Sequence, residues 1–126
     1  MRFKHDTSKW PGSLIVTAFL SPAAPRPSLR ARAELDTGAD ITCVPETLIE
    51  DLGVTPQGLV HVQGFREEPP EEVPSFDIRL SIDDTRYFTL EVISAPKDYV
   101  LLGRDFLNAL ILHADGPRLV FDLEYP

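Results

Sequence analysis

The chain has 126 residues and a net charge of −8, with 43% hydrophobic and 25% charged residues. This length and composition are typical of a soluble globular protein, and we predict that residues 1–126 form a single domain. The negative charge argues against nucleic acid and anionic membranes as partners, because both require a basic face. Twelve prolines against seven glycines favour strands and turns over long helices.

The single cysteine, Cys43, cannot form an internal disulfide, so nothing implies an oxidising compartment. Its neighbours are mostly apolar, and we expect a buried structural thiol rather than a reactive one. The apolar run at residues 14–20 is too short for a signal peptide or a membrane span. We therefore predict a cytoplasmic location.

The first half of the chain predicts strands and one short helix. Residues 14–20 are continuously apolar, which indicates a strand buried on both faces. Residues 30–35 alternate charged and apolar side chains, as a half-buried strand does. Residues 46–52 are expected to form a helix that ends at Gly53. A further strand is predicted at residues 59–65.

The second half contains the strongest strand signal. Residues 75–82 and 88–92 alternate with period 2 on either side of a turn and predict an antiparallel hairpin. A helix is expected at residues 104–110 and a closing strand at 119–123. Short strands with two helical segments predict an all-β fold, a small closed barrel.

Asp36-Thr37-Gly38 follows the predicted strand at 30–35, and this motif occurs once. A carboxylate at a strand end, followed by a hydroxyl residue and a glycine, is the nucleus of an aspartic protease site. A plain turn after a strand is the alternative, because Asp and Gly are common in turns. The tripeptide alone does not separate the two interpretations.

A second motif, Val-Leu-Leu-Gly-Arg-Asp-Phe-Leu at residues 100–107, follows later in the chain. With Asp-Thr-Gly-Ala-Asp at 36–40, it makes the chain resemble the retropepsin family, the retroviral-type aspartic proteases and their cellular and bacterial relatives. The resemblance covers about residues 13–123. It implies a homodimeric barrel of the retropepsin-like acid protease type, in which a hairpin at about 59–82 is the flap.

The resemblance also implies roles for individual residues. Asp36 would be catalytic, and the Asp36 carboxylates of two subunits would share a proton and activate a water. Arg104 would pair with Asp40, because its planar fork suits a carboxylate. The remaining implied site residues are Thr37, Gly38 and Ala39 in the catalytic loop, Gly38, Asp40, Gln63, Gly64 and Phe65 for substrate, and Leu101, Leu102 and Gly103 in the second motif.

The expected partners are a second copy of the chain and a peptide or protein substrate with apolar side chains beside the scissile bond. No cofactor and no metal are expected, since the three histidines are scattered without zinc-type spacing. The resemblance implies that terminal strands of both subunits interleave, and residues 119–123 and 1–10 are the candidates. Trp10 is either an interface anchor or a plug at one end of the barrel.

Two departures from the retroviral pattern affect the function. Ala39 cannot donate a hydrogen bond to Asp36, which predicts activity at weakly acidic to near-neutral pH. The flap tip is acidic, with Glu67, Glu68, Glu71 and Glu72 either forming a solvated face or steering basic substrates. The chain is predicted to be an aspartic endopeptidase, and the alternative is a non-catalytic dimeric module that binds peptides with the same fold.

Overall fold

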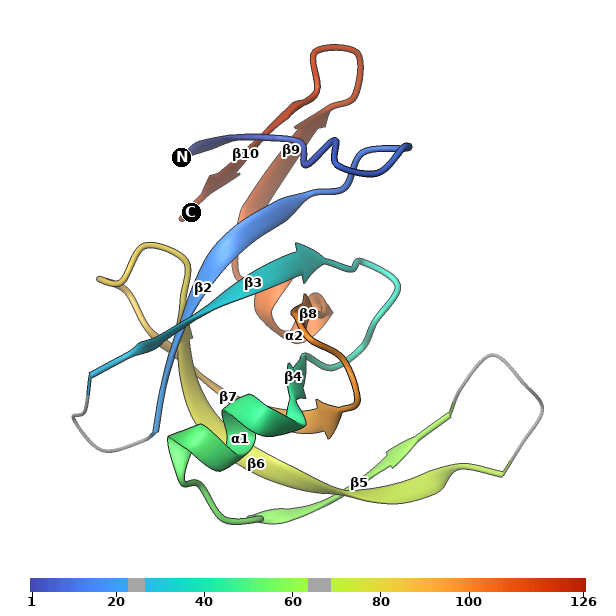
Figure 1. Cartoon of the computed structure of the whole chain (residues 1–126), viewed down its shortest axis with the longest axis vertical. Coiled ribbons are helices and arrows are strands. Elements are labelled where there is room, and N and C mark those ends of the chain that lie inside the picture. The colour runs from blue at the N-terminus through green and yellow to red at the C-terminus, as the bar shows by residue number, and fades with distance from the viewer. Residues whose placement is uncertain (23–26, 64–68) are drawn as a thin grey trace.

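The computed structural model describes residues 1–22, 27–63 and 69–126 and is built mostly of strands (Figure 1). The elements in chain order are β1 (Arg2–Lys4), β2 (Ile15–Ser21), β3 (Leu29–Leu35), β4 (Cys43–Pro45), α1 (Glu46–Leu52), β5 (Gly58–Val62), β6 (Glu71–Ser81), β7 (Phe88–Ala95), β8 (Val100–Leu102), α2 (Arg104–Leu107), β9 (Ile111–Asp115) and β10 (Val120–Glu124).

Six strands form a closed ring. The larger sheet has the order β2-β3-β8-β4-β7-β6-β5, and a further pairing of β2 with β6 closes it. Apolar side chains that alternate along these strands fill the interior, and the fully buried ones include Leu20, Ile78, Leu80, Val92, Val100 and Leu102. The predicted small closed barrel is confirmed.

One predicted helix has the expected bounds, and the predicted hairpin forms with longer strands, β6 beginning at Glu71 rather than at residue 75 and β7 ending at Ala95 rather than at residue 92. Helix α1 spans Glu46–Leu52, and Gly53 ends it with a φ of 68°, a left-handed conformation that favours glycine. Strands β6 and β7 form the predicted antiparallel hairpin, with Phe76 opposite Val92. Period-2 patterns and a glycine stop were therefore reliable signals here.

Three expectations were wrong in detail. Strand β2 is buried on one face only, because Thr17 on its outer face is exposed to solvent. Helix α2 ends at Leu107 rather than at residue 110, and the chain continues with tighter turns in which Ala109 N–H donates to the Phe106 carbonyl. Strand β9, directly after these turns, was not predicted.

The two ends of the chain meet in a second sheet with the order β1-β10-β9 (Figure 1). Arg2 lies opposite Asp122 in the β1–β10 ladder, and Phe3 stacks on Phe121 with ring centroids 5.1 Å apart. Both candidate interface strands, β1 and β10, therefore pair with each other within one chain.

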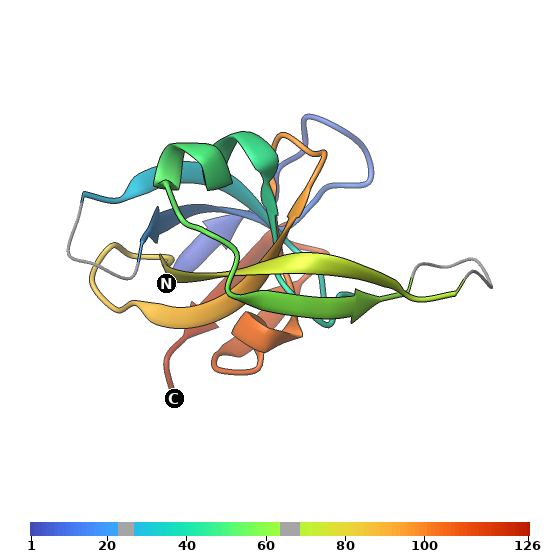
Figure 2. The same cartoon turned by 90° about the horizontal axis from the view of Figure 1, so that it is seen from below.

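The segment expected to be the flap contains the β5–β6 hairpin, which extends away from the barrel (Figure 2). Its ladder runs from Gly58 opposite Ser75 to Val62 opposite Glu71. Gly64, Phe65, Glu67 and Glu68, to which the sequence assigned roles, lie outside the described residues. Within the described ranges, no helix has the length and apolar character needed to cross a membrane.

Candidate active site

Asp36 stands at the end of β3, where β3 pairs in parallel with β8. Its N–H extends this ladder by donating to the Leu102 carbonyl at 2.9 Å. Its carboxylate accepts one hydrogen bond from the described residues, from Gly38 N–H at 3.0 Å. The side chain is half-buried, and its remaining lone pairs stay available for a ligand or a water.

Arg104 holds the loop that follows Asp36. Its Nη1 donates to the Thr37 carbonyl at 2.7 Å, and its Nη2 forms an ion pair with the Asp40 carboxylate. Its backbone N–H donates to the Ala39 carbonyl at 2.8 Å. The structure therefore brings together the two motifs that the sequence singled out, including the expected Asp40–Arg104 pair.

Gly103 allows the two motifs to approach closely. A Cβ at this position would lie 2.7 Å from the Ile41 carbonyl carbon and 3.1 Å from the Ala39 oxygen. Both contacts involve backbone atoms, so any side chain would push β8 away from the catalytic loop. This close approach explains why a glycine stands between the apolar strand and α2.

A part-buried link between Thr42 and Asp105 was missed by the sequence analysis. Asp105 accepts hydrogen bonds from Thr42 N–H at 2.9 Å and from the Thr42 hydroxyl at 2.7 Å. The same hydroxyl oxygen accepts from Gly103 N–H at 3.1 Å, and Thr42 is fully buried. The signal was present, since Asp105 belongs to the second motif, but its partner is 63 positions away in the sequence.

Cys43 lies next to this link and is half-buried. Burial raises the pKa of the Cys43 thiol, and the negative charges of Asp105 and Asp36 raise it further. A raised pKa keeps the thiol protonated and unreactive at neutral pH, consistent with the structural role expected for it. Within the described ranges, the His, Cys, Asp and Glu side chains form no group of three that could hold a metal.

The structure does not bring every expected residue into contact. Gln63 is exposed at the described end of the flap and makes no hydrogen bond with a described residue of the catalytic loop. The Thr37 hydroxyl likewise has no partner among the residues that the structure describes. Leu101 lies opposite both Glu34 and Cys43. The second motif therefore pairs with β3 and β4, the two strands that flank the Asp36 loop.

A closed ring of short strands with an aspartate loop clamped by a Gly-Arg element defines a retropepsin-like aspartic protease. The family model described as aspartyl protease matches residues 28–106, from the start of β3 into α2, and the chain belongs to this family. The predicted family and the predicted aspartic-type endopeptidase are thereby confirmed. No curated protein is detectably similar to the chain in sequence.

Solved structures of proteases show the same fold. A retropepsin-like aspartic protease from Rickettsia conorii is 15% identical, with 99% of this chain and 90% of that chain covered and a TM-score of 0.70. The Simian Foamy Virus (mac) protease is 23% identical, with 75% and 92% covered and a TM-score of 0.57. The EIAV protease, solved with the inhibitor HBY-793, is 17% identical, with 79% and 89% covered and a TM-score of 0.56.

Proposed function

We propose that two copies of this chain form an endopeptidase whose active centre contains one Asp36 from each copy. One observation supports this most directly: each chain has a single Asp-Thr-Gly loop, whose carboxylate accepts only one hydrogen bond from the described residues. A single carboxylate cannot act as base and acid in the same step. A second copy of the same loop supplies the missing group.

The chemistry follows from placing two carboxylates about 3 Å apart, where both cannot ionise easily, so that they share one proton. The ionised carboxylate takes a proton from a bound water, which attacks the scissile carbonyl carbon. The protonated carboxylate donates to the carbonyl oxygen, giving a tetrahedral diol. Breakdown of the diol breaks the C–N bond as the amine nitrogen receives a proton.

The neighbouring residues position the substrate and the dyad. The Gly38 carbonyl and the Asp40 carboxylate would bind the substrate backbone, and Gln63, Gly64 and Phe65 of the flap would cover it. Arg104 fixes the Thr37 carbonyl and Asp40 before substrate arrives. Such preorganisation matters because a catalytic group displaced by about 1 Å costs about 100-fold in rate.

The second sheet supports a particular way of assembling two copies. β10 has β1 on one edge and β9 on the other, so a partner strand can be added only at an outer edge. The β1 edge presents Arg2 and Lys4, the kind of charge that protects an edge strand. The β9 edge presents Ile111, which is 51% exposed, and contains neither Lys, Arg nor Pro. Pairing of two β9 strands about a two-fold axis fits this difference between the charged β1 edge and the β9 edge.

The function is tested with the wild-type chain and Asp36→Asn on a mixed peptide library between about pH 3 and pH 8. We expect wild type to cut and the variant not to cut. At low protein concentration, where dimers are scarce, the rate should rise with the square of concentration. A wild-type dimer that binds peptides but cuts none would leave the peptide-binding module as the function.

The assembly is tested separately with charge substitutions on the two sheet edges. Ile111→Lys should weaken self-association in sedimentation experiments and lower activity at low concentration, with little effect on thermal stability. Lys4→Glu on the β1 edge is the control and should leave self-association unchanged. The reverse pattern would assign the interface to β1.

A further inference from the structure

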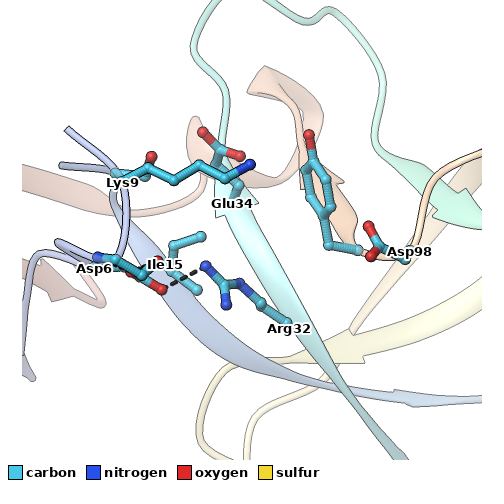
Figure 3. A pocket seen from close by; sticks show the side chains of 9 residues that line it. Asp6, Lys9, Ile15, Arg32, Glu34 and Asp98 are labelled. Atoms are coloured by element: carbon cyan, nitrogen blue, oxygen red, sulfur yellow. Dashed lines mark hydrogen bonds and ion pairs between the residues drawn. The ribbon is translucent and has the colours of Figure 1, made fainter. Parts of the chain in front are cut away.

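A pocket of about 260 Å³ opens between the N-terminal segment, β3 and the loop before β8. Its charged and aromatic lining comes from Asp6, Lys9, Arg32, Glu34, Asp98 and Tyr99, most of which are labelled in Figure 3. It is smaller than the about 300–1,000 Å³ of most small-molecule sites. This volume suits one large side chain.

The pocket, which we call the Glu34 pocket, is related to Asp36 through Glu34, which lines it. Glu34 precedes Asp36 by two positions, and Asp36 N–H continues the ladder to the Leu102 carbonyl. Asp36 directly follows β3, and if the pleat of the strand continues through it, both side chains lie on one face, about 6.6 Å apart along the chain. A residue of an extended substrate next to the scissile bond can reach that distance.

Some charged side chains of the pocket are paired with one another, and others are not. The Arg32 guanidinium is engaged by Asp6, with Nη2 2.5 Å from the carboxylate, so these two charges cancel (Figure 3). Within the described part of the chain, Glu34, Asp98 and Lys9 take part in no ion pair. Two carboxylates against one ammonium leave the pocket with a net negative charge.

A cationic side chain fits this lining better than an apolar or an acidic one. A guanidinium or ammonium would meet two carboxylates and the ring of Tyr99, over which Lys97 Nζ already lies 5.4 Å from the centroid, so the carboxylates provide the main attraction. An acidic side chain would meet Lys9 and the Asp6-paired Arg32 but would be repelled by Glu34 and Asp98. An apolar side chain would remove these charged groups from water without compensation.

We propose that the Glu34 pocket binds a Lys or Arg side chain of the substrate residue adjacent to the scissile bond, and that Glu34 determines this specificity. The inference rests on the proposed function, because it takes Asp36 as the reacting group. In a symmetric dimer the pocket occurs once on each side of the scissile bond. The sequence resemblance implied apolar side chains at these positions, so the two expectations predict different substrates.

The test uses peptides that differ only in the residue beside the scissile bond, which is Lys, norleucine or Glu. Norleucine matches the length of the lysine stem without its charge. We expect wild type to cut the Lys peptide with a kcat/KM at least about tenfold higher than the norleucine peptide, from one charge-assisted contact. Glu34→Gln should reduce this Lys-to-norleucine ratio about tenfold.

Lys9→Gln is the matched control, because it neutralises a charge of the opposite sign in the same pocket. It should raise the Lys-to-norleucine ratio or leave it unchanged. Equal rates on the Lys and norleucine peptides, or a ratio that Glu34→Gln does not change, would overturn the proposal. A preference for the Glu peptide would also overturn the proposal and would indicate that Lys9, rather than Glu34, determines the specificity of the pocket.

A binding measurement separates failure of this inference from failure of the proposed function. The same peptides with a reduced, non-cleavable bond are titrated into wild type and Glu34→Gln by fluorescence anisotropy. Tighter binding of the Lys peptide that Glu34→Gln abolishes would support the pocket even if no peptide is cut. Equal binding of the Lys and norleucine peptides would reject the pocket whether or not cleavage occurs.

Discussion

Asp36 and Asp83 each follow a strand of the same barrel and begin a turn, but their carboxylates are used differently. The Asp83 carboxylate accepts hydrogen bonds from the Ser81 hydroxyl and from the N–H groups of Thr85 and Arg86, at 2.9 to 3.0 Å. The Asp36 carboxylate accepts one from the described residues, from Gly38 N–H. Asp83 is thus committed to holding its turn, whereas the turn at Asp36 is held by other groups.

The groups that hold the Asp36 turn come from the second motif. Arg104 binds the Thr37 carbonyl and Asp40, and Asp105 binds Thr42. Because these contacts fix the loop from outside, the Asp36 carboxylate does not have to stabilise it. The comparison separates an aspartate left available for the proposed reaction from one that supports structure.

The largest expected effect comes from making the same substitution at both aspartates. Asp36→Ala should lower kcat/KM at least about 10³-fold, because it removes an acid–base group, and should change stability little. Asp83→Ala should leave kcat/KM nearly unchanged and lower the free energy of unfolding by about 1–3 kcal/mol, because turn N–H groups lose their acceptor. Peptide cleavage and urea unfolding measure the two effects.

A stability loss in Asp36→Ala, or an activity loss in Asp83→Ala, would contradict the different roles assigned to the two aspartates. If Asp36→Ala unfolded the protein, its carboxylate would be a structural group like that of Asp83. If Asp83→Ala were inactive while folded, the turn after β6 would belong to the active site.

A smaller effect is expected from the clamp. Arg104→Lys keeps the charge, but a lysine ammonium lacks the planar guanidinium with which Arg104 binds the Thr37 carbonyl and Asp40 at the same time. We expect kcat/KM to fall about 100-fold, mainly through kcat, because the catalytic loop loses its fixed position. Arg118→Lys, which affects an exposed pair with Asp115, is the control and should change kcat/KM less than about twofold. Unchanged kcat in Arg104→Lys would show that the loop is held without the clamp.

The part-buried link between Thr42 and Asp105 should affect stability more than catalysis. The two Asp105 oxygens accept from Thr42 N–H and from the Thr42 hydroxyl. Asp105→Asn replaces one of these oxygens with an NH₂ group, so one Thr42 donor loses its acceptor. We expect the free energy of unfolding to fall by about 1–3 kcal/mol. Thr42→Val should cost a similar amount, and the double variant should cost less than the sum, because both changes remove one network. Strict additivity in urea unfolding would show that the two residues act independently.

The sequence predicted those parts of the molecule that depend on local patterns. Alternation identified β3, β6 and β7, and Gly53 identified the end of α1. The two motifs identified the Asp36 loop and the Arg104 contacts that hold it. The α2 prediction was too long because helical spacing continues to Leu110, while the chain must leave the helix to enter β9. Apolar spacing in so short a segment does not separate a helix from a strand.

The parts that could not be predicted depend on contacts between distant segments. The Thr42–Asp105 link joins positions 63 apart, and no periodicity connects them. The Glu34 pocket likewise combines the N-terminal segment, β3 and the loop before β8. The pairing of β10 with both β1 and β9 is set by how the chain ends pack on the barrel. Such features follow from the tertiary fold, which side-chain patterns specify only indirectly.

The smallest expected effect concerns acid stability and uses the Asp83 turn alone. Burial raises the pKa of Asp83, but hydrogen bonds from the N–H groups of Arg86 and Thr85 outweigh it and lower the pKa well below its usual range. The unfolded chain then binds the proton more readily, so this stabilisation is complete above about pH 5 and declines as pH falls further. The difference in Tm between wild type and Asp83→Ala should therefore narrow between about pH 5 and pH 2 in thermal unfolding. A difference that stays constant over this range would mean that the turn does not favour the ionised carboxylate, and the contrast with Asp36 would then rest on hydrogen-bond number alone.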